Sequence, residues 1–326
     1  MSETTGPVGS TEPTGTTGPV GSSGPIGISG PIGIIGLGTM GSAMARRFAG
    51  QGTEVLATSR SQASRDALAG TDGVQVVRSP RELVAALAEQ TRGDLVVLTS
   101  LPSGPQVTAV ADALLAAMAW GADGRRLVLV DTSTCAPADA QAVAHRFAIS
   151  GHAFADAPVS GGPTGARDGT LSIMVGADDA LFAQVAPALA PIAGRVVHCG
   201  PSGCGQVTKA ANQLIVACTV QAVAEALTLA GRNGVDPAVA RTALLGGYAA
   251  SRVLELQGER MVTGDFTPGG TIALLAKDVR IAQGLATAAG MAAPALDATA
   301  VQVRTLAEAD PGIDHSALIK LLGGPL

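Results

Sequence analysis

The sequence predicts an α/β domain followed by an all-α domain, with one long helix joining the two. Between residues 30 and 200, short runs rich in β-branched residues alternate with Ala-rich segments of helical period, which is typical of a parallel sheet covered by helices. After Gly205 the strand pattern stops and only helical segments follow. With 326 residues, 47% of them hydrophobic and 14% charged, the chain is long and apolar enough for two packed cores.

Residues 1–29 differ from the rest in composition, because they are almost entirely Gly, Pro, Ser and Thr with a few apolar residues. Such a segment cannot bury enough apolar surface to offset the entropy of ordering, so we expect a flexible tail. It has neither the basic region nor the apolar core of a signal peptide. The apolar stretch Leu214–Leu229 contains Gln221 and Glu225, so we interpret it as a buried amphipathic helix and expect no membrane span.

The charge and cysteine content exclude several classes of partner. The net charge is −5 and no long basic run occurs, so we expect no nucleic acid and no membrane among the partners. The four cysteines lack the spacing of a zinc site or a disulfide framework, so we expect free thiols, a cytoplasmic location and no bound metal.

The expected strands and helices of the first domain alternate along the chain. The strands are Ile32–Gly36, Glu54–Ser59, Val74–Val77, Asp94–Ser100, Arg126–Asp131, His152–Ala157, Leu171–Val175 and Arg195–Cys199. The helices between them are Ser61–Ala69, Pro80–Gln90, Gln106–Trp120 and Ala136–Ile149, besides one that follows the first strand. The second domain is expected to contain Gln206–Arg232, Pro237–Leu245, Ser251–Met261, Ile272–Ala289, Ala293–Glu308 and His315–Leu322. We therefore place a domain boundary near residue 200.

The segment GIIGLGTMGSAMARRF carries the most informative local motif. Its strand is followed by Gly36, Gly38 and Gly41 in the G-x-G-x-x-G spacing, and a helix begins at once. The first glycine allows a tight turn, the second lets a pyrophosphate approach the backbone, and the third allows close packing of helix and strand. The free N–H groups of the helix start would face the anion, so the motif predicts a dinucleotide site.

The end of the second strand indicates which dinucleotide is preferred. An NAD site usually has a carboxylate there for the ribose 2′-hydroxyl, whereas this chain has Ser59, Arg60 and Ser61, with Arg65 one turn later. A guanidinium and two hydroxyls suit a 2′-phosphate. We therefore predict NADP(H) as the preferred cofactor, with mixed use of NAD(H) as the alternative.

Three further segments have side chains suited to chemistry on a small acid. Ser160, Gly161 and Gly162 offer one hydroxyl and two unobstructed amides, which could bind a carboxylate or simply form a turn. Lys209, Asn212 and Gln213 share one face of the long helix. If that lysine is partly buried, its pKa falls towards the range useful for proton transfer.

The third segment, TIALLAKDVRIA, places a charged pair in an apolar helix. Lys277 is a candidate for the substrate carboxylate, and Asp278 could neutralise or orient that lysine. A solvated helix face is the alternative interpretation.

These motifs together resemble the β-hydroxyacid dehydrogenase family, which includes 3-hydroxyisobutyrate dehydrogenases. The similar segments, in the family's order over residues 31–322, are GLGTMG, SLPSGPQV, DTSTCAP, DAPVSGGPTGA, GTLSIMVG, GCGQVTKAANQ and AKD. The resemblance implies an NADP-binding Rossmann domain over residues 30–200. It also implies an all-helical domain over 201–326 for substrate and dimer contacts, and a homodimer or homotetramer.

The resemblance also implies roles for individual residues. Lys209 matches the catalytic lysine, which acts as general acid in reduction and general base in oxidation. Ser160, Gly161 and Gly162 match the loop that binds the substrate carboxylate, and Asn212 and Gln213 match the polar pair beside the lysine. The remaining positions that match cofactor contacts are Leu37, Thr39, Met40, Leu101, Pro102, Thr134, Lys277 and Asp278.

The substrate implied by the resemblance is a small semialdehyde acid. The segments KAANQLIVA, AEALTLAGRNGVDP, LGGYAASRVLE and DHSAL resemble the family members that reduce tartronate semialdehyde to glycerate. The alternatives are 3-hydroxyisobutyrate, L-threonate or sulfolactaldehyde dehydrogenation, imine reduction, which Lys209 argues against, and non-catalytic NADP binding. Two positions bear on the pocket wall: Gly270 stands where relatives often have an aromatic residue, and Tyr248 lies in a loop that lines the pocket in relatives.

Overall fold

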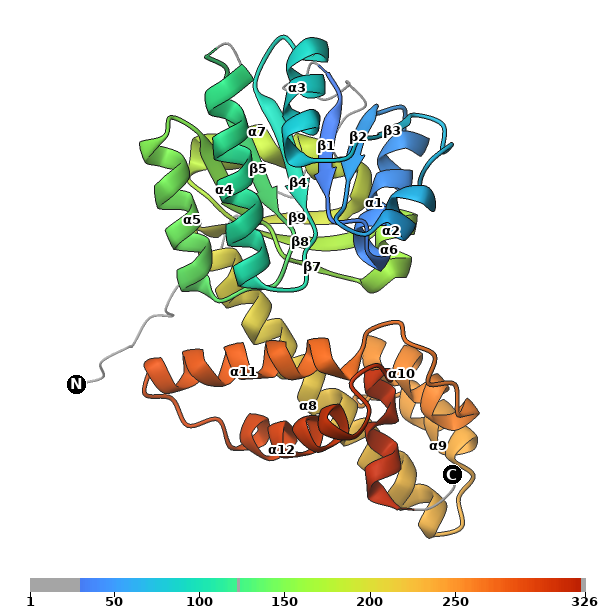
Figure 1. Cartoon of the computed structure of the whole chain (residues 1–326). Helices are drawn as coiled ribbons and strands as arrows, with labels where there is room; N and C mark the ends of the chain where they lie inside the picture. The colour runs from blue at the N-terminus through green and yellow to red at the C-terminus, as the bar shows by residue number, and fades with distance from the viewer. Residues whose placement is uncertain (1–29, 122–123, 324–326) are drawn as a thin grey trace, which may run out of the picture.

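The computed structural model describes residues 30–121 and 124–323, so the predicted tail over 1–29 lies outside the described part. Figure 1 shows the strands gathered in one part of the molecule and the later helices in another. Helix α8 (Cys204–Arg232) begins at the sheet and runs into the helical part. The expected fold class, a Rossmann-like α/β domain followed by an all-helical one, is confirmed.

Nine strands in the described part of the chain form one sheet, and the first six are parallel in the order β3-β2-β1-β4-β5-β6. The strands are β1 (Ile32–Ile35), β2 (Val55–Thr58), β3 (Val74–Val76), β4 (Leu95–Thr99), β5 (Leu127–Asp131), β6 (Ala153–Asp156), β7 (Val159–Ser160), β8 (Leu171–Gly176) and β9 (Ala193–Gly200). Strand β8 pairs antiparallel with β6 and β7 and parallel with β9. Because the strand order reverses between β1 and β4, ligands are expected at their carboxyl ends.

Helices cover both faces of the sheet. They are α1 (Thr39–Gly50), α2 (Gln62–Asp66), α3 (Pro80–Gln90), α4 (Gly104–Gly121), α5 (Pro137–Ile149), α6 (Gly162–Asp168) and α7 (Asp179–Leu189), followed by the 3-10 turn η1 (Ala190–Ile192). The core on one face contains α1, α6 and α7, and the core on the other contains α3, α4 and α5. The eight predicted strands are all present within two residues at each end.

Strand β7 and helices α6 and α7 have no counterpart among the predicted segments. Strand β7 has two residues, too few for a periodic pattern. Helix α6 contains Gly162, Pro163 and Gly165, which lower its intrinsic helical propensity. Helix α7 has a recognisable start, because Asp178 caps it by accepting a hydrogen bond from the Leu181 amide at 2.8 Å.

The helical part is built around α8. The other elements are α9 (Pro237–Leu245), α10 (Arg252–Thr263), α11 (Ile272–Ala288), α12 (Pro294–Ala309) and η2 (His315–Leu322), the last being a 3-10 helix. Residues Ala217, Val220 and Leu227 of α8 are completely buried against these helices. Because the strands end at Gly200 and α8 begins at Cys204, we keep the proposed domain boundary near residue 200.

Helix α8 also has the length and apolar composition that a membrane-spanning helix needs, with a mean hydropathy of 1.7 over 18 residues. In this chain it packs against β8, α10, α11 and η2. Only 33% of that apolar window is buried, so the interpretation of Leu214–Leu229 as a buried helix is correct for one face only. Its polar residues Gln221 and Glu225 are joined by a hydrogen bond of 2.8 Å.

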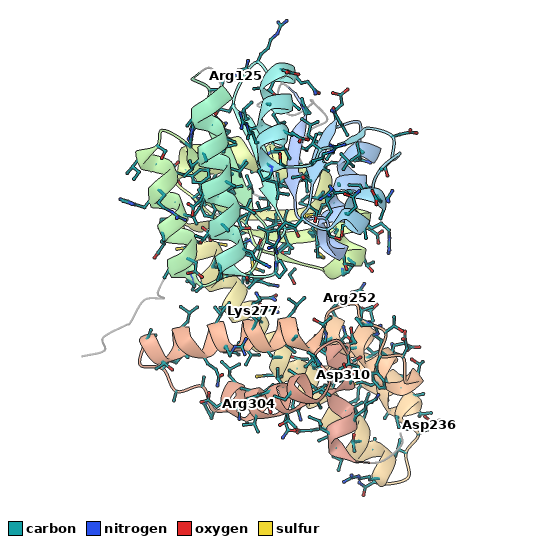
Figure 2. The ribbon with its side chains drawn as sticks, in the orientation of Figure 1. Arg125, Asp236, Arg252, Lys277, Arg304 and Asp310 are labelled. Atoms are coloured by element: carbon teal, nitrogen blue, oxygen red, sulfur yellow. The ribbon has the colours of Figure 1, made fainter. Side chains whose placement is uncertain are left out.

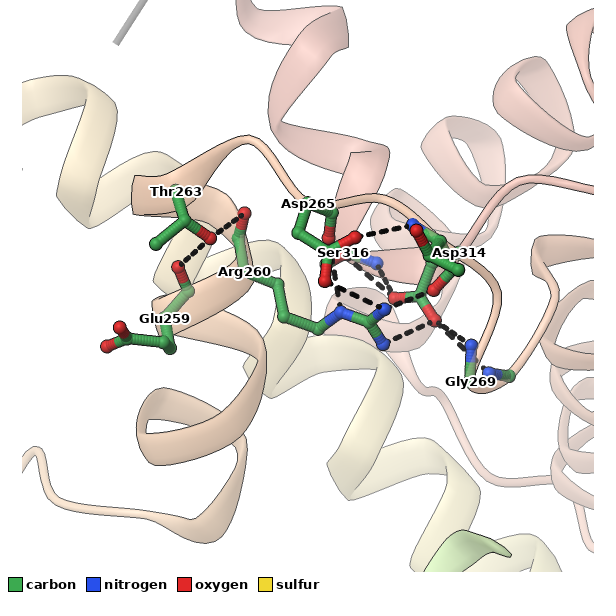
Figure 3. A network of polar contacts seen from close by, with 9 residues as sticks. Glu259, Arg260, Thr263, Asp265, Gly269, Asp314 and Ser316 are labelled. Carbon is green, nitrogen blue, oxygen red and sulfur yellow. Dashed lines mark hydrogen bonds and ion pairs between the residues drawn. The ribbon is translucent and has the colours of Figure 1, made fainter.

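A buried carboxylate holds the loop that leads into α11 (Figure 3). Asp314 is completely buried, and its Oδ2 accepts hydrogen bonds from the amides of Gly269 and Gly270 at 2.9 and 3.1 Å. The same oxygen lies 3.2 Å from Nη1 of Arg260. Asp314 Oδ1 accepts from both the amide and the hydroxyl of Ser316. This network therefore holds the loop that precedes α11.

The core around α3 yields a stability prediction. Leu87→Ala should lower the free energy of unfolding by about 2–5 kcal/mol, because the Leu87 side chain is completely buried. Glu89→Ala, two residues later on the exposed face, should change it by about 0.5 kcal/mol or less. Urea unfolding of the two variants measures the difference, and equal losses would contradict this description of the core.

Candidate active site

The glycine loop between β1 and α1 has the backbone geometry that a dinucleotide site requires. Gly36 has φ +100°, and an added Cβ would overlap the carbonyl oxygen of Ser100. A Cβ on Gly41 would overlap the carbonyl oxygen of Gly36, so helix and turn are in direct contact. A Cβ on Gly38 would meet nothing within 4 Å, which leaves the backbone there open to a ligand.

The start of α1 offers amides to that ligand. Gly38 is the N-cap and provides no side-chain cap, and the first turn has no acidic residue. The first amides, including that of Thr39, are therefore available for a phosphate. Leu37 is buried, and its carbonyl accepts a hydrogen bond of 3.0 Å from the Ser42 hydroxyl, which stiffens the loop. Met40 packs against the core beneath it.

The end of β2 has an exposed arginine on a braced loop. The Arg65 guanidinium donates to the carbonyl oxygens of Ser59 and Arg60, so it holds the loop from behind. The Ser61 hydroxyl accepts from the Ser64 amide at 3.2 Å and caps α2. The guanidinium of Arg60 has no hydrogen-bond partner within the described part of the chain. The loop therefore presents Arg60 to solvent or to a ligand.

Helix α8 and helix α11 meet through a chain of polar contacts. Lys209 is 7% exposed, and its Nζ donates to Oε1 of Gln213 at 3.1 Å. The same oxygen accepts from Nδ2 of Asn212 at 2.8 Å. Gln213 Nε2 in turn donates to Oδ2 of Asp278 at 2.6 Å. The three residues of α8 that the sequence analysis grouped on one face are thus connected to α11.

Lys277 joins this cluster to the sheet domain. Its Nζ lies 2.8 Å from Oδ1 of Asp278 and donates to the carbonyl oxygen of Thr134 at 2.5 Å, just after β5. Figure 2 shows Lys277 on the side of α11 that faces the sheet domain. The chain has three lysines, and two of them, Lys209 and Lys277, belong to this cluster.

The surroundings of Lys209 change its acidity. Burial lowers the pKa of Lys209 from 10.5 to about 8. The negative charge of Asp278 opposes that shift, and the positive charge of Lys277 adds to it. A lysine with this pKa can both donate and accept a proton near neutral pH.

The Ser160 loop provides exposed amides near the start of α6. Ser160 is half-buried in β7, and Gly161 and Gly162 are exposed with φ of +132° and +63°. No hydrogen bond in the described part of the chain occupies the Ser160 hydroxyl. The loop can therefore bind a carboxylate, although no contact links it directly to Lys209 here.

Tyr248 and Gly270, the two residues that the sequence analysis connected with the pocket wall, have different surroundings. Tyr248 is fully exposed, and no hydrogen bond in the described part of the chain joins it to the lysine cluster, so this structure leaves it outside that cluster. A Cβ on Gly270 would lie 3.2 Å from the His315 ring, which leaves little room for an aromatic residue there.

Two other candidates sit beside a buried network that the sequence analysis did not identify. The amide of Leu101 donates to the Ser133 hydroxyl at 2.8 Å, and that hydroxyl donates to Asp131 Oδ1 at 2.5 Å. Pro102 follows in the exposed part of the same loop. Asp131 and Asp156 each end a buried strand, and this position at the carboxyl edge of the sheet could have signalled their importance.

Comparison with known proteins finds matches over both parts of the chain. Residues 31–200 match the family model for the NAD binding domain of 6-phosphogluconate dehydrogenase. Residues 203–322 match the model described as NAD-binding of NADP-dependent 3-hydroxyisobutyrate dehydrogenase. The chain is 37% identical to the 2-hydroxy-3-oxopropionate reductase of Escherichia coli over 88% of this chain and 95% of that protein.

Two mycobacterial comparisons extend the similarity. The chain is 33% identical to a probable 3-hydroxyisobutyrate dehydrogenase of Mycobacterium tuberculosis, over 88% of this chain and 96% of that one. A solved structure of M. tuberculosis 3-hydroxyisobutyrate dehydrogenase with L-serine superposes with a TM-score of 0.78 at 30% identity, covering 90% and 99% of the two chains.

The fold, the glycine loop and these matches define an oxidoreductase that uses a nicotinamide dinucleotide. Within that class the chain belongs to the β-hydroxyacid dehydrogenase family, of the 3-hydroxyisobutyrate dehydrogenase and tartronate semialdehyde reductase type. The family predicted from the sequence motifs is thereby confirmed.

Proposed function

We propose that this enzyme is an NADP-preferring reductase of small semialdehyde acids, with tartronate semialdehyde reduced to glycerate as its main reaction. The observation that carries the proposal is the buried Lys209, whose amine contacts Gln213 where the helical part meets the cofactor domain. The 37% identity to a 2-hydroxy-3-oxopropionate reductase supports this substrate, because that compound is tartronate semialdehyde.

Such a reaction needs a hydride donor or acceptor and a group that transfers a proton. A bound nicotinamide supplies the hydride in reduction or accepts it in oxidation. The Lys209 ammonium stabilises the negative charge that develops on the carbonyl oxygen and then transfers a proton to it, which leaves the neutral amine. In the opposite direction the neutral amine removes the hydroxyl proton. Solvent protons restore the starting state.

The neighbouring groups orient the substrate and the lysine. Ser160 and the exposed amides of Gly161 and Gly162 bind the substrate carboxylate. Gln213 positions the amine of Lys209, and Asn212 fixes the Gln213 amide. The attachment of Lys277 to Thr134 holds α11 against the cofactor domain. Orientation of this kind contributes much of an enzyme's rate enhancement.

Oxidation of 3-hydroxyisobutyrate is the second candidate function. It is favoured by the name of the 33% identical M. tuberculosis relative and by a 3-hydroxyisobutyrate dehydrogenase of Pseudomonas aeruginosa that is 35% identical over 71% of this chain. Initial rates with tartronate semialdehyde and with 3-hydroxyisobutyrate distinguish the two. If neither compound is turned over while the cofactor binds, a different small acid or a non-catalytic protein would be favoured.

Exposed apolar residues on α8 and the free cysteines bear on the oligomeric state and the location of the protein. The exposed side of α8 carries Val207, Ile215 and Leu229, which are 48%, 64% and 66% exposed. Such apolar surface favours association, so we propose a homodimer or homotetramer formed through the helical part. The four free cysteines suit a reducing compartment, and we propose a cytoplasmic location.

Replacing the lysine tests the chemical proposal. Lys209→Ala should lower kcat by about 100-fold or more, because it removes the general acid, while NADPH binding stays nearly unchanged. Lys320→Ala is the matched control, since the Lys320 amine lies over the Phe266 ring, apart from the Lys209 cluster. Steady-state rates and cofactor titration give both quantities. Near-normal turnover of Lys209→Ala would refute the role of this lysine.

The pKa of Lys209 predicts opposite pH dependences for the two directions. Its folded-state pKa is about 8, so reduction, which needs the ammonium, should fall as pH rises through 8. Oxidation needs the neutral amine and should rise over the same range. Asp278→Asn removes the charge that opposes the lowering, so both midpoints should move to lower pH. Rates that do not change between pH 7 and 9 would argue against Lys209 as the titrating group.

Arg60 tests the cofactor preference. Arg60→Ala should reduce kcat/KM for NADPH about 10- to 100-fold, the scale of one lost charged hydrogen bond, and leave kcat/KM for NADH nearly unchanged. Arg92→Ala is the control, because Arg92 is exposed before β4, at the opposite end of the sheet. A wild-type preference for NADH would contradict the proposed use of NADP.

A further inference from the structure

The first turn of α8 is capped by a residue from another element. Gly203 is the N-cap of α8 with φ +93°, it has no side chain, and the first turn has no acidic residue. The buried carboxylate of Asp156, at the end of β6, fills this role. Its Oδ1 accepts from the Gly203 amide at 2.7 Å, and its Oδ2 accepts from the Gln206 amide at 3.0 Å. These are the N-cap and N3 amides, the pair that a capping box satisfies.

The surrounding backbone is shaped to admit this carboxylate. Asp156 is completely buried, and its register partner on β8 is Gly176. A Cβ on Gly176 would lie 2.5 Å from Asp156 Oδ1, and a Cβ on Gly205 would lie 2.8 Å from Oδ2. Burial raises the pKa of Asp156, while the hydrogen bonds from the start of α8 act against that shift. An unpaired buried carboxylate would be very unfavourable, so these contacts restrict where α8 can start.

The side chain of Gln206 extends the same attachment to the loop after β5. Its Oε1 accepts from the Cys135 amide at 3.1 Å, and its Nε2 donates to the Ser133 carbonyl at 2.9 Å. Thr134, between these two residues, accepts the hydrogen bond from Lys277. The first turn of α8 and the lysine of α11 are therefore both attached to one three-residue loop of the cofactor domain.

We propose that Asp156 is a positioning residue for Lys209, an inference that rests on the proposed function. Lys209 follows Gln206 by three residues and lies on the same face of α8, so a shift of the first turn moves its amine directly. The amine is buried only while that turn keeps its place against the sheet. Misplacement by about 1 Å is enough to cost roughly 100-fold in rate.

Asp156→Asn tests the inference, because it keeps the size of the side chain but turns one acceptor into a donor that faces an amide. We expect kcat to fall at least 10-fold, while NADPH affinity changes less than 3-fold. The pH midpoint near 8 should rise towards the ordinary lysine pKa of 10.5, since the displaced amine becomes hydrated. Gly205→Ala displaces the same turn from the helix side and should shift the midpoint in the same direction.

Leu87→Ala is the control for a general loss of stability. The Leu87 side chain is completely buried, as that of Asp156 is, but it belongs to α3, which packs against α4, β1, β2 and β4. It should lower the melting temperature without moving the pH midpoint. Unchanged kcat and midpoint in Asp156→Asn would overturn the inference. A loss of kcat without a midpoint shift in both Asp156→Asn and Gly205→Ala would also overturn it.

The two proposals fail in different ways. If Lys209→Ala retains turnover, the proposed function fails whatever Asp156→Asn does. If Lys209→Ala loses turnover but Asp156→Asn and Gly205→Ala keep the wild-type midpoint, only the positioning role fails. Retained NADPH binding shows that a variant has folded, so the comparison uses whichever of Asp156→Asn and Gly205→Ala binds the cofactor.

Discussion

Helix α8 begins beneath the carboxyl edge of the sheet and continues as the centre of the helical part. A helix that starts inside a protein has buried amides, and buried amides need acceptors. Asp156 provides two acceptor oxygens from β6. The Gln206 side chain makes two more hydrogen bonds to the loop after β5, accepting one from Cys135 and donating one to Ser133. The placement of the helical part against the cofactor domain depends on this junction, because the first turn of α8 is attached to the sheet there.

The charge arrangement of the site follows from that junction. Three residues of α8 and two of α11 form one hydrogen-bonded and ionic cluster at the seam between the two parts. Its members are Lys209, Asn212, Gln213, Lys277 and Asp278. Two cations share one anion there, and burial makes the ammonium form of Lys209 costly. The same packing that stabilises the helices thus gives the lysine a pKa suited to moving protons near neutral pH.

The two ends of the site have different mechanical properties. The glycine loop is rigid, because Gly36 and Gly41 are in direct backbone contact and Leu37 is buried. Asp314 holds the loop before α11 in place as well, because its carboxylate accepts hydrogen bonds from the amides of Gly269 and Gly270. By contrast, Gly161 and Gly162 are exposed, and no hydrogen bond within residues 30–121 and 124–323 occupies their amides. In the proposed reaction, a substrate would therefore bind between a fixed cofactor edge with fixed lysines on one side and an open backbone loop on the other.

The fold class, the eight longer strands, the glycine loop and the grouping of Lys209, Asn212 and Gln213 could be predicted from the sequence, because they depend on local periodicity and on spacing within one helix. The remaining features come from tertiary packing. It brought Asp278 to Gln213 and Lys277 to Thr134, and it left Tyr248 exposed. It also placed Asp156 at the start of α8, 47 residues before the amide that it caps. Contacts between distant segments depend on how the elements pack, and no local pattern records that arrangement.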